Sequence, residues 1–167
     1  MNVAQRTGIA GMLYALLAAP AFAQTDYLNP DGRLAHELSV EATETGGFVG
    51  VQSYSFKIAP DGRFTKQYAI GSGPLRAMSG VVSGEALAAL AAELARSDLG
   101  RMPSRIVGQG KPPTGAADIP TIEVRITWGD KQVAARYVMG VDEPAPAAEQ
   151  IAAVNRILAA VRNATGR

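Results

Sequence analysis

The strongest constraint on the fold is a strict alternation of apolar and polar side chains on both sides of Gly129-Asp130. A period of two indicates half-buried β-strands, and a two-residue connection that contains glycine indicates a hairpin. Residues whose numbers sum to 259 then lie opposite each other, which places Glu123 beside Arg136 in a favourable cross-strand charge pair. The sequence therefore predicts an antiparallel hairpin with one apolar face, formed by Ile122, Val124, Ile126, Trp128, Val133, Ala135 and Tyr137.

A second hairpin is predicted around Pro60-Asp61-Gly62. Proline presets the first turn angle, aspartate hydrogen-bonds to its own backbone, and glycine accepts a positive φ. We expect the first strand to run from Phe48 to about Ala59, and a glycine bulge in the turn would oppose Ala59 to Arg63. The resulting pairs are Ile58 with Phe64, Phe56 with Lys66, and Tyr54 with Tyr68.

Two other segments have strand character. Apolar residues alternate from Leu34, which predicts a strand over residues 34–41 with His36 on its apolar side. Residues 76–82 form a short extended piece. By contrast, the glycines and prolines of residues 100–118 predict a long loop.

Two helices are predicted from periods near 3.6 residues. Ser83 would cap the first, which ends near Arg96 and turns Glu93 and Arg96 toward water. The second follows the loop over residues 141–145, and Pro146 suits its first turn. The buried stripes would be Leu87, Leu90 and Leu94 in the first helix, and Ile151, Val154, Leu158 and Val161 in the second.

The resulting order of elements is β-β-β-(β)-α-β-β-α. A mostly antiparallel sheet with two helices packed on one face buries every apolar stripe in that order. We therefore expect one α+β domain over residues 34–163, with a flexible leader over residues 24–33 and a frayed tail over residues 164–167.

The first 23 residues have the three parts of a cleavable secretory signal. Arg6 supplies the positive charge, residues 9–19 form an apolar run, and Ala21-Phe22-Ala23 supplies the small residues of a cleavage site. The apolar run is too short for a membrane span, which needs roughly 20 residues. We therefore expect export to the periplasm or the medium, a mature chain that begins at Gln24, and no stable membrane insertion.

Composition narrows the classes of partner and of chemistry. Removing Arg6 with the signal leaves 15 basic and 15 acidic residues, so that no basic surface for nucleic acid or anionic lipid is indicated. The chain has no cysteine, which excludes disulfides and thiol nucleophiles. A single histidine, His36, excludes zinc sites built on paired histidines, and we interpret it as a structural residue.

Three other segments resemble catalytic motifs, but none of them is interpreted as a catalytic site. Gly71-Ser72-Gly73 is followed by proline and is not a nucleophile elbow. Gly108-Gln109-Gly110-Lys111 ends like a phosphate loop, but Pro112 stands where a magnesium-binding hydroxyl would be needed. Asp142-Glu143 is interpreted as a solvated start of the last helix rather than as an acid–base pair. We therefore predict no enzyme and no cofactor or metal.

One stretch carries a more specific signal. Residues 45–51, Thr-Gly-Gly-Phe-Val-Gly-Val, resemble the Ser-Gly-Gly-Phe-x-Gly-Ile signature of emfourin-like proteins, bacterial inhibitors of thermolysin-like metalloproteases. Downstream, Ser79-Gly80-Val81-Val82, a Leu-rich helix, Met102-Pro103-Ser104, an Asp118-containing loop, an apolar hairpin and a last helix follow in a similar order. The resemblance covers about residues 37–163. The signal peptide and the longer first hairpin depart from the family pattern.

The resemblance implies that exposed loops occlude a protease cleft. The contact segments it implies are the loop over residues 104–118 and the bend at residues 46–50, although Gly46-Gly47 is also explained by a bulge or a positive-φ bend that opens a strand. The residues concerned are Gly46, Gly47, Phe48, Gly50, Gln109, Lys111, Thr114 and Asp118.

Two other classes of function remain open. A non-catalytic periplasmic accessory or envelope protein fits the absence of catalytic motifs equally well. A carboxylate-only enzyme such as a glycosidase would require two carboxylates about 5 to 9 Å apart in a deep cleft.

Overall fold

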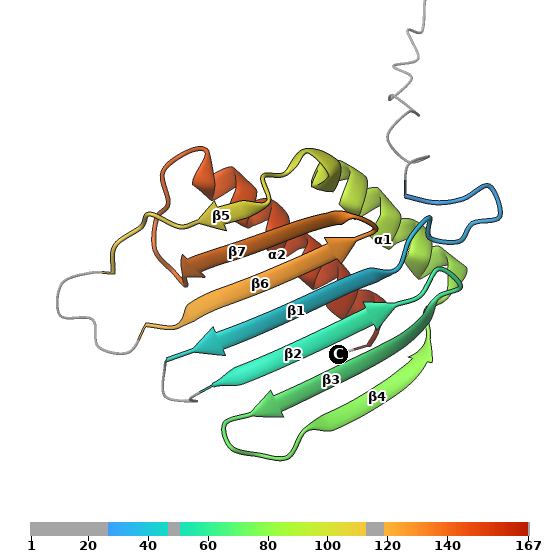
Figure 1. The fold of residues 1–167 in the computed structure, drawn as a ribbon, viewed down its shortest axis with the longest axis horizontal. Helices are drawn as coiled ribbons and strands as arrows, with labels where there is room; N and C mark the ends of the chain where they lie inside the picture. Colours follow the sequence, from blue (N-terminus) through green and yellow to red (C-terminus); the bar gives the residue numbers. More distant parts are fainter. Residues whose placement is uncertain (1–26, 47–50, 113–118, 167) are drawn as a thin grey trace, which may run out of the picture.

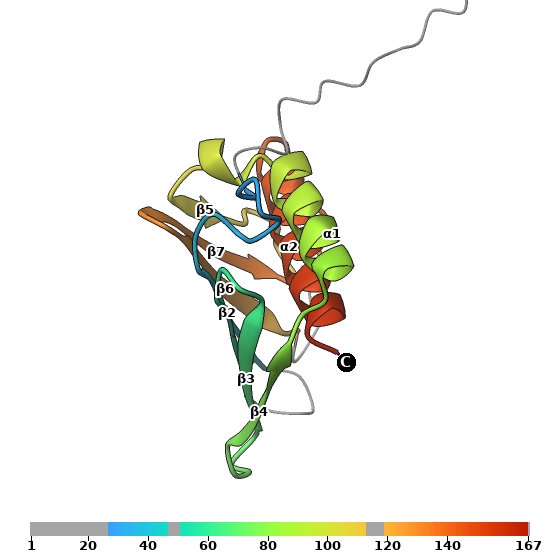
Figure 2. The same cartoon turned by 90° about the vertical axis from the view of Figure 1, so that its right-hand side faces the viewer.

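Two helices cover one face of a seven-stranded sheet in the computed structural model of the chain (Figures 1 and 2). The structure describes residues 27–46, 51–112 and 119–166. The strands are β1 (Leu38–Thr45), β2 (Gln52–Ile58), β3 (Arg63–Ile70), β4 (Arg76–Val81), β5 (Arg105–Val107), β6 (Thr121–Trp128) and β7 (Lys131–Val138). The helices are α1 (Gly84–Arg96), the 3₁₀ turn η2 (Leu99–Arg101) and α2 (Ala147–Ala164). The predicted α+β fold class is confirmed.

The strand order across the sheet is β4-β3-β2-β1-β6-β7-β5. All neighbouring pairs are antiparallel except β5 and β7, which are parallel. Both predicted hairpin registers are confirmed: Glu123 pairs with Arg136, Ile122 pairs with Tyr137, and Tyr54 pairs with Tyr68. The face covered by the helices is called the helix face below, and the opposite face is called the outer face.

Apolar side chains of the strands and of both helices meet between the sheet and the helices. The predicted stripe of α1 is buried, as is the predicted stripe of α2. Ser83 caps α1 as predicted, because its Oγ accepts the backbone N–H of Ala86 at 3.2 Å. The helix α2 begins directly after Pro146. The largest fully buried side chains of this core include Phe56, Leu38, Ile58, Leu90, Leu94, Ile126 and Ile157.

The prediction of a long loop over residues 100–118 was wrong in its first part. Residues 105–107 form β5, which is held at the edge of β7 by the bonds Ala134 N–H to Ser104 O (2.9 Å) and Gly108 N–H to Arg136 O (2.7 Å). Ile106 is buried, and its side chain fixes the short strand to the core. A single buried residue between exposed neighbours leaves almost no periodicity in the sequence.

The segment before β1 also differs from the prediction. β1 begins at Leu38 rather than at Leu34, because Leu34 pairs instead with Leu28 and donates its N–H to Pro60 O. Tyr27 is buried against Trp128, with ring centroids 5.4 Å apart, so part of the expected leader belongs to the core. His36 is exposed and meets the Trp128 ring edge-on, rather than lying on the buried side of a strand.

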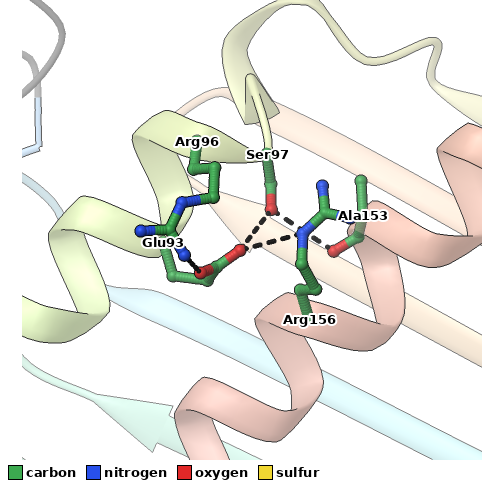
Figure 3. Close-up of polar contacts among 5 residues, drawn as sticks. All are labelled: Glu93, Arg96, Ser97, Ala153 and Arg156. Carbon is green, nitrogen blue, oxygen red and sulfur yellow. Dashed lines mark hydrogen bonds and ion pairs between the residues drawn. The ribbon is translucent and has the colours of Figure 1, made fainter.

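Glu93 was predicted to face water, but it lies between the two helices with only 13% of its side chain exposed. One oxygen accepts Arg156 Nε of α2 at 3.0 Å and Ser97 Oγ at 3.2 Å, and the other pairs with Arg96 at 2.8 Å (Figure 3). Ser97 Oγ also lies 3.5 Å from Ala153 O. The carboxylate therefore joins α1 to α2.

Residues 164–166 do not form the expected frayed tail. Thr165 is buried, and its Oγ1 donates to Val161 O at 2.9 Å. Lys66 of β3 is also buried; its Nζ donates to Gly166 O at 3.0 Å and lies 5.7 Å from the Phe56 ring centroid. This cation ties the residues that follow α2 to β3, the strand next to one edge of the sheet.

Candidate functional site

One end of the sheet gathers the segments that the sequence singles out. Thr45 of β1 lies opposite Thr121 of β6, and Thr121 lies opposite Val138 of β7. β5 runs parallel to β7, so it leaves the sheet at the same end. We call this the loop end, and it comprises residues 45–46, 107–112, 119–121 and 138–143. The tight turns at residues 60–62 and 129–130 lie at the opposite end.

Gly46 sits at the loop end with a φ of +95°, a left-handed conformation that favours glycine. A Cβ on this residue would lie 3.3 Å from Ile119 O and 3.6 Å from Pro120 Cα. The backbone conformation therefore explains why a glycine stands at position 46, and it agrees with the positive-φ bend expected from the sequence. It also brings the ends of the two predicted contact segments side by side.

Gln109 and Lys111 are exposed at the loop end, and the backbone beside them is clamped. Glu143 Oε2 accepts the N–H of Gln109 at 2.6 Å and the N–H of Gly110 at 2.8 Å. The prediction that Asp142-Glu143 is merely a solvated helix start was therefore wrong for Glu143, which holds a loop 33 residues away in sequence. Two charge-assisted bonds to adjacent amides fix the local shape of that loop.

The clamp depends on the absence of side chains at Gly108 and Gly110. A Cβ on Gly108 would meet Glu143 Oε1 and would lie 2.8 Å from Tyr137 Cβ. A Cβ on Gly110 would lie 2.8 Å from Asp142 O. Glu143 Oε1 is buried in this contact, and no donor within the described residues reaches it. Gly108 and Gly110, which resembled part of a phosphate loop in the sequence, therefore leave the space that the Glu143 carboxylate occupies.

The other residues implied by the resemblance lie outside the described parts of the chain. They are Gly47, Phe48, Gly50, Thr114 and Asp118.

A cleft of about 290 Å³ lies beside the clamp, between α2 and the loop end of the sheet. The buried side chains of Ile122, Ile151 and Leu158 contribute apolar surface to it. Arg162 lies at its rim with the guanidinium 5.1 Å from the Tyr54 ring centroid. The cleft offers an apolar interior with a cation at its edge, as sites for small ligands or single side chains often do.

Tyr137 supplies the buried polar group of this cleft. Its hydroxyl donates to Asn155 Oδ1 of α2. Burial raises the pKa of the Tyr137 phenol above its ordinary value, and the positive charge of Arg162 partly opposes that rise. The phenol is therefore a neutral hydrogen-bonding group at neutral pH.

The outer face carries a wider hollow of about 580 Å³ over β1, β5, β6 and β7. Ala134 lies between Arg105 and Arg125 in adjacent strands, and its small side chain leaves the space. Two ion pairs border it, Arg125 Nη1 to Glu41 Oε2 at 3.6 Å and Arg136 Nε to Glu123 Oε1 at 3.3 Å. This surface is polar, shallow and suited to a partner with mixed charge.

Sequence reasoning missed Glu143, Asn155 and Arg162 as members of the loop-end site. A signal existed for two of them, since residues 155, 158 and 162 share one stripe of α2 and therefore project toward the same surface. No local pattern marks Glu143, because its partners are backbone amides of a distant loop.

A scan of the sequence against protein-family models finds no match, and a search of the curated proteins finds none either. The resemblance to emfourin-like proteins therefore rests on the residues quoted above. No helix in the described ranges has the length and apolar character needed to cross a membrane.

Proposed function

We propose that the chain is an exported, non-catalytic binding protein that inhibits a thermolysin-like metalloprotease through its loop end. The observation that carries this proposal is the clamp by Glu143, which fixes the backbone of Gln109 and Gly110 beside exposed side chains. The resemblance over residues 45–51 supplies the class of target.

A clamped loop suits inhibition for a thermodynamic reason. A segment that is already held in its bound shape loses little conformational entropy on association, so more of the contact energy appears as affinity. The sheet and α2 provide the rigid support, since Glu143 lies between the end of β7 and the start of α2. Inhibition would then be occlusion of the protease cleft and would need no chemistry from this chain.

The direct test is titration of the purified protein against a panel of thermolysin-like proteases with a peptide substrate. The expected result is stoichiometric loss of protease activity at micromolar inhibitor or below. Absence of inhibition by micromolar protein across the panel would contradict the proposal.

The variant Glu143→Gln tests whether the clamp matters. It keeps the size of the side chain but removes the charge that strengthens the two bonds to Gln109 and Gly110. We expect inhibition to weaken about tenfold, which corresponds to about 1.4 kcal/mol of binding free energy. Asp142→Asn is the matched control, because it makes the same charge change at an exposed neighbour.

Replacement of residues 111–116 by a short Gly-Ser linker tests the loop itself. Surface loops tolerate such changes thermodynamically, so the thermal unfolding midpoint should be retained while inhibition weakens. Inhibition that survives both this replacement and Glu143→Gln would assign the contact to the bend at residues 46–50.

The export part of the proposal has its own test. The protein recovered from the cell envelope or the medium should begin at Gln24 when its N-terminus is sequenced. An intact Met1 on the recovered product would contradict the proposed signal peptide.

A second candidate function is a periplasmic accessory protein that binds its partner on the outer face. The hollow bordered by Arg105, Arg125 and Arg136 favours it, because these side chains are exposed on a rigid sheet. Substitution of Arg105 by Glu would abolish that binding while leaving protease inhibition unchanged, so the two candidates are distinguishable.

A further inference from the structure

β4 ends the sheet on one side, and in the described parts of the chain no strand pairs with it beyond β3. It is six residues long and carries one charged side chain, Arg76. The opposite edge, β5, is only three residues long and also carries an arginine. Proteins usually protect a long edge strand with charges, proline or a covering segment. Within the described residues, Arg76 is the only one of these protections that β4 has.

The free backbone groups of β4 can be assigned from its pairing. Val82 N–H donates to Gly62 O at 2.9 Å, one step beyond the last residue pair of β3 and β4. Backbone groups of successive residues point to opposite sides of a strand, so the even-numbered residues direct theirs toward β3. The odd-numbered residues direct their N–H and C=O groups away from the sheet, and they are Ala77, Ser79 and Val81.

The side chains along this edge are unusually apolar for their exposure. Leu75 is 64% exposed, Met78 is 47% exposed, and Val81 is 71% exposed. Val81 pairs with Arg63 and lies on the outer face, which neither helix covers. Met78 pairs with Lys66 on the helix face, but the β3–β4 hairpin extends past the two helices (Figure 2). An edge with free backbone groups and exposed apolar side chains has the chemistry of a strand-pairing interface.

We propose that two copies of this chain pair through β4, antiparallel and about a two-fold axis at Met78, so that one sheet continues across both. Met78 then lies opposite Met78 of the partner subunit, and Leu75 lies opposite Val81 of the partner subunit. In this register the two most exposed apolar side chains of the edge, Leu75 and Val81, lie opposite each other, and the two-fold axis repeats this pair once. The register also directs hydrogen bonds between the outward groups of Ala77 and those of the partner's Ser79.

The charges and shapes of the edge favour this register. Arg76 lies opposite the partner's Gly80, so no like charges face each other. Gly80 has no side chain because the Phe64 ring occupies its place: a Cβ there would lie 2.7 Å from Phe64 Cε1. The guanidinium of the partner's Arg76 can therefore extend over Gly80 toward the Phe64 ring, an arrangement that attracts cations.

The neighbouring symmetric registers are poorer. An axis at Ala77 would place Arg76 opposite the partner's Met78 and Leu75 opposite the partner's Ser79. An axis at Ser79 would leave Leu75 outside the paired strand. The self-complementarity of β4 about Met78 is the reason for choosing a second copy of this chain as the occupant rather than an unrelated extended peptide.

Single cysteines test the register, because the natural chain contains none. Opposed residues at the axis have Cα atoms about 4.5 to 5.5 Å apart, within reach of a disulfide. M78C should form a covalent dimer under mild oxidation, seen on a non-reducing gel. S79C is the control, since each of its thiols would lie opposite an alanine, and it should stay monomeric. Efficient cross-linking of S79C without that of M78C would overturn the register.

Sedimentation velocity over a range of protein concentrations tests the dimer without cross-linking. M78K places two positive charges opposite each other, so we expect it to raise the dimer dissociation constant at least about tenfold. S79K adds the same charge opposite the partner's Ala77, and we expect a smaller change. Circular dichroism would verify that both variants are folded. A single monomeric species at concentrations up to about 1 mM would overturn the proposal.

Discussion

The β6–β7 and β3–β4 hairpins belong to the same sheet but differ in what covers them. In β6 and β7 every helix-facing side chain from Ile122 to Trp128 is buried, as are Val133, Ala135 and Tyr137. In β3 and β4 only Phe64 and Lys66 are buried on that face, while Ile70 and Met78 are about half exposed. Figure 1 shows α2 crossing behind β6 and β7, with β3 and β4 at the far side of the sheet.

The comparison shows that the pattern of apolar and polar residues determines which face of the sheet a side chain points to, but not whether that side chain is buried. A period of two decides which side chains share a face, and the registers of the β2–β3 and β6–β7 pairs follow from it. Whether that face is dry depends on the reach of the helices, which is a property of the whole fold. The β6–β7 hairpin is therefore expected to be sensitive to truncation, and the β3–β4 hairpin is expected to be available for contacts.

The largest expected effect sharpens this contrast. Leu90 of α1 is buried over the covered part of the sheet, and Leu90→Ala should lower the free energy of unfolding by about 2 to 5 kcal/mol. Ile70→Ala removes a side chain that is half exposed, so we expect a loss below about 1 kcal/mol. Denaturant unfolding of both variants measures the difference. Equal losses would mean that something covers β3 in solution.

A second prediction concerns a position in the uncovered β3–β4 hairpin that should nevertheless be sensitive to substitution. Gly80→Ala lies in the uncovered hairpin but directs a methyl group at the Phe64 ring, so we expect a loss of about 1 to 3 kcal/mol from overpacking. Gly84→Ala is the matched control, because open space surrounds that glycine at the start of α1. It should stabilise by up to about 1 kcal/mol through helix propensity. A fully stable Gly80→Ala protein would show that the ring moves aside.

A third prediction concerns the contact between α1 and α2, the two helices that cover the sheet. Glu93→Gln weakens the bonds to Arg156 and Arg96, and we expect it to cost about 1 kcal/mol. Glu123→Gln removes an exposed ion pair with Arg136 and should cost less than about 0.5 kcal/mol. Thermal unfolding of the two variants should rank them in this order. The reverse ranking would mean that the junction between α1 and α2 contributes little to the cover.

The smallest effect concerns pH. Burial raises the pKa of Tyr137 in the folded state above its ordinary value of 10.0, so above pH 10 the unfolded chain releases this proton first. Stability from this group is present below pH 10 and is lost as pH rises through the folded-state pKa. Tyr137→Phe should therefore flatten the fall of stability in the alkaline range, by less than about 1 kcal/mol. An unchanged slope in denaturant titrations would contradict this prediction.

The sequence was sufficient where structure is local. The turns at residues 60–62 and 129–130 determine their hairpins, and Ser83 determines the start of α1. It was insufficient where a partner is distant. β5 needed β7, and the role of Glu93 needed Arg156 on another helix, 63 residues away.

The same reasoning explains the candidate site. Gly46 was recognisable as a bend because a pair of glycines at the edge of a strand pattern indicates a positive φ. Glu143 was not recognisable, because a carboxylate that accepts backbone N–H groups leaves no complementary side chain in the sequence. The exposure of Lys111 could be predicted from the sequence. The two hydrogen bonds by which Glu143 holds the neighbouring backbone of Gln109 and Gly110 could not.

The position of β1 has a consequence for how the chain acquires its structure. β1 is central, yet one of its neighbours is β6, so residues as distant as Leu38 and Trp128 must meet. Contacts between distant residues slow folding, because the intervening chain must be closed into a loop before they form. The β2–β3 hairpin can form early, but the seam between β1 and β6 must wait until β6 has been synthesised. A chain proposed to cross a membrane in an extended state benefits from that delay, since it stays threadable until the last third has emerged.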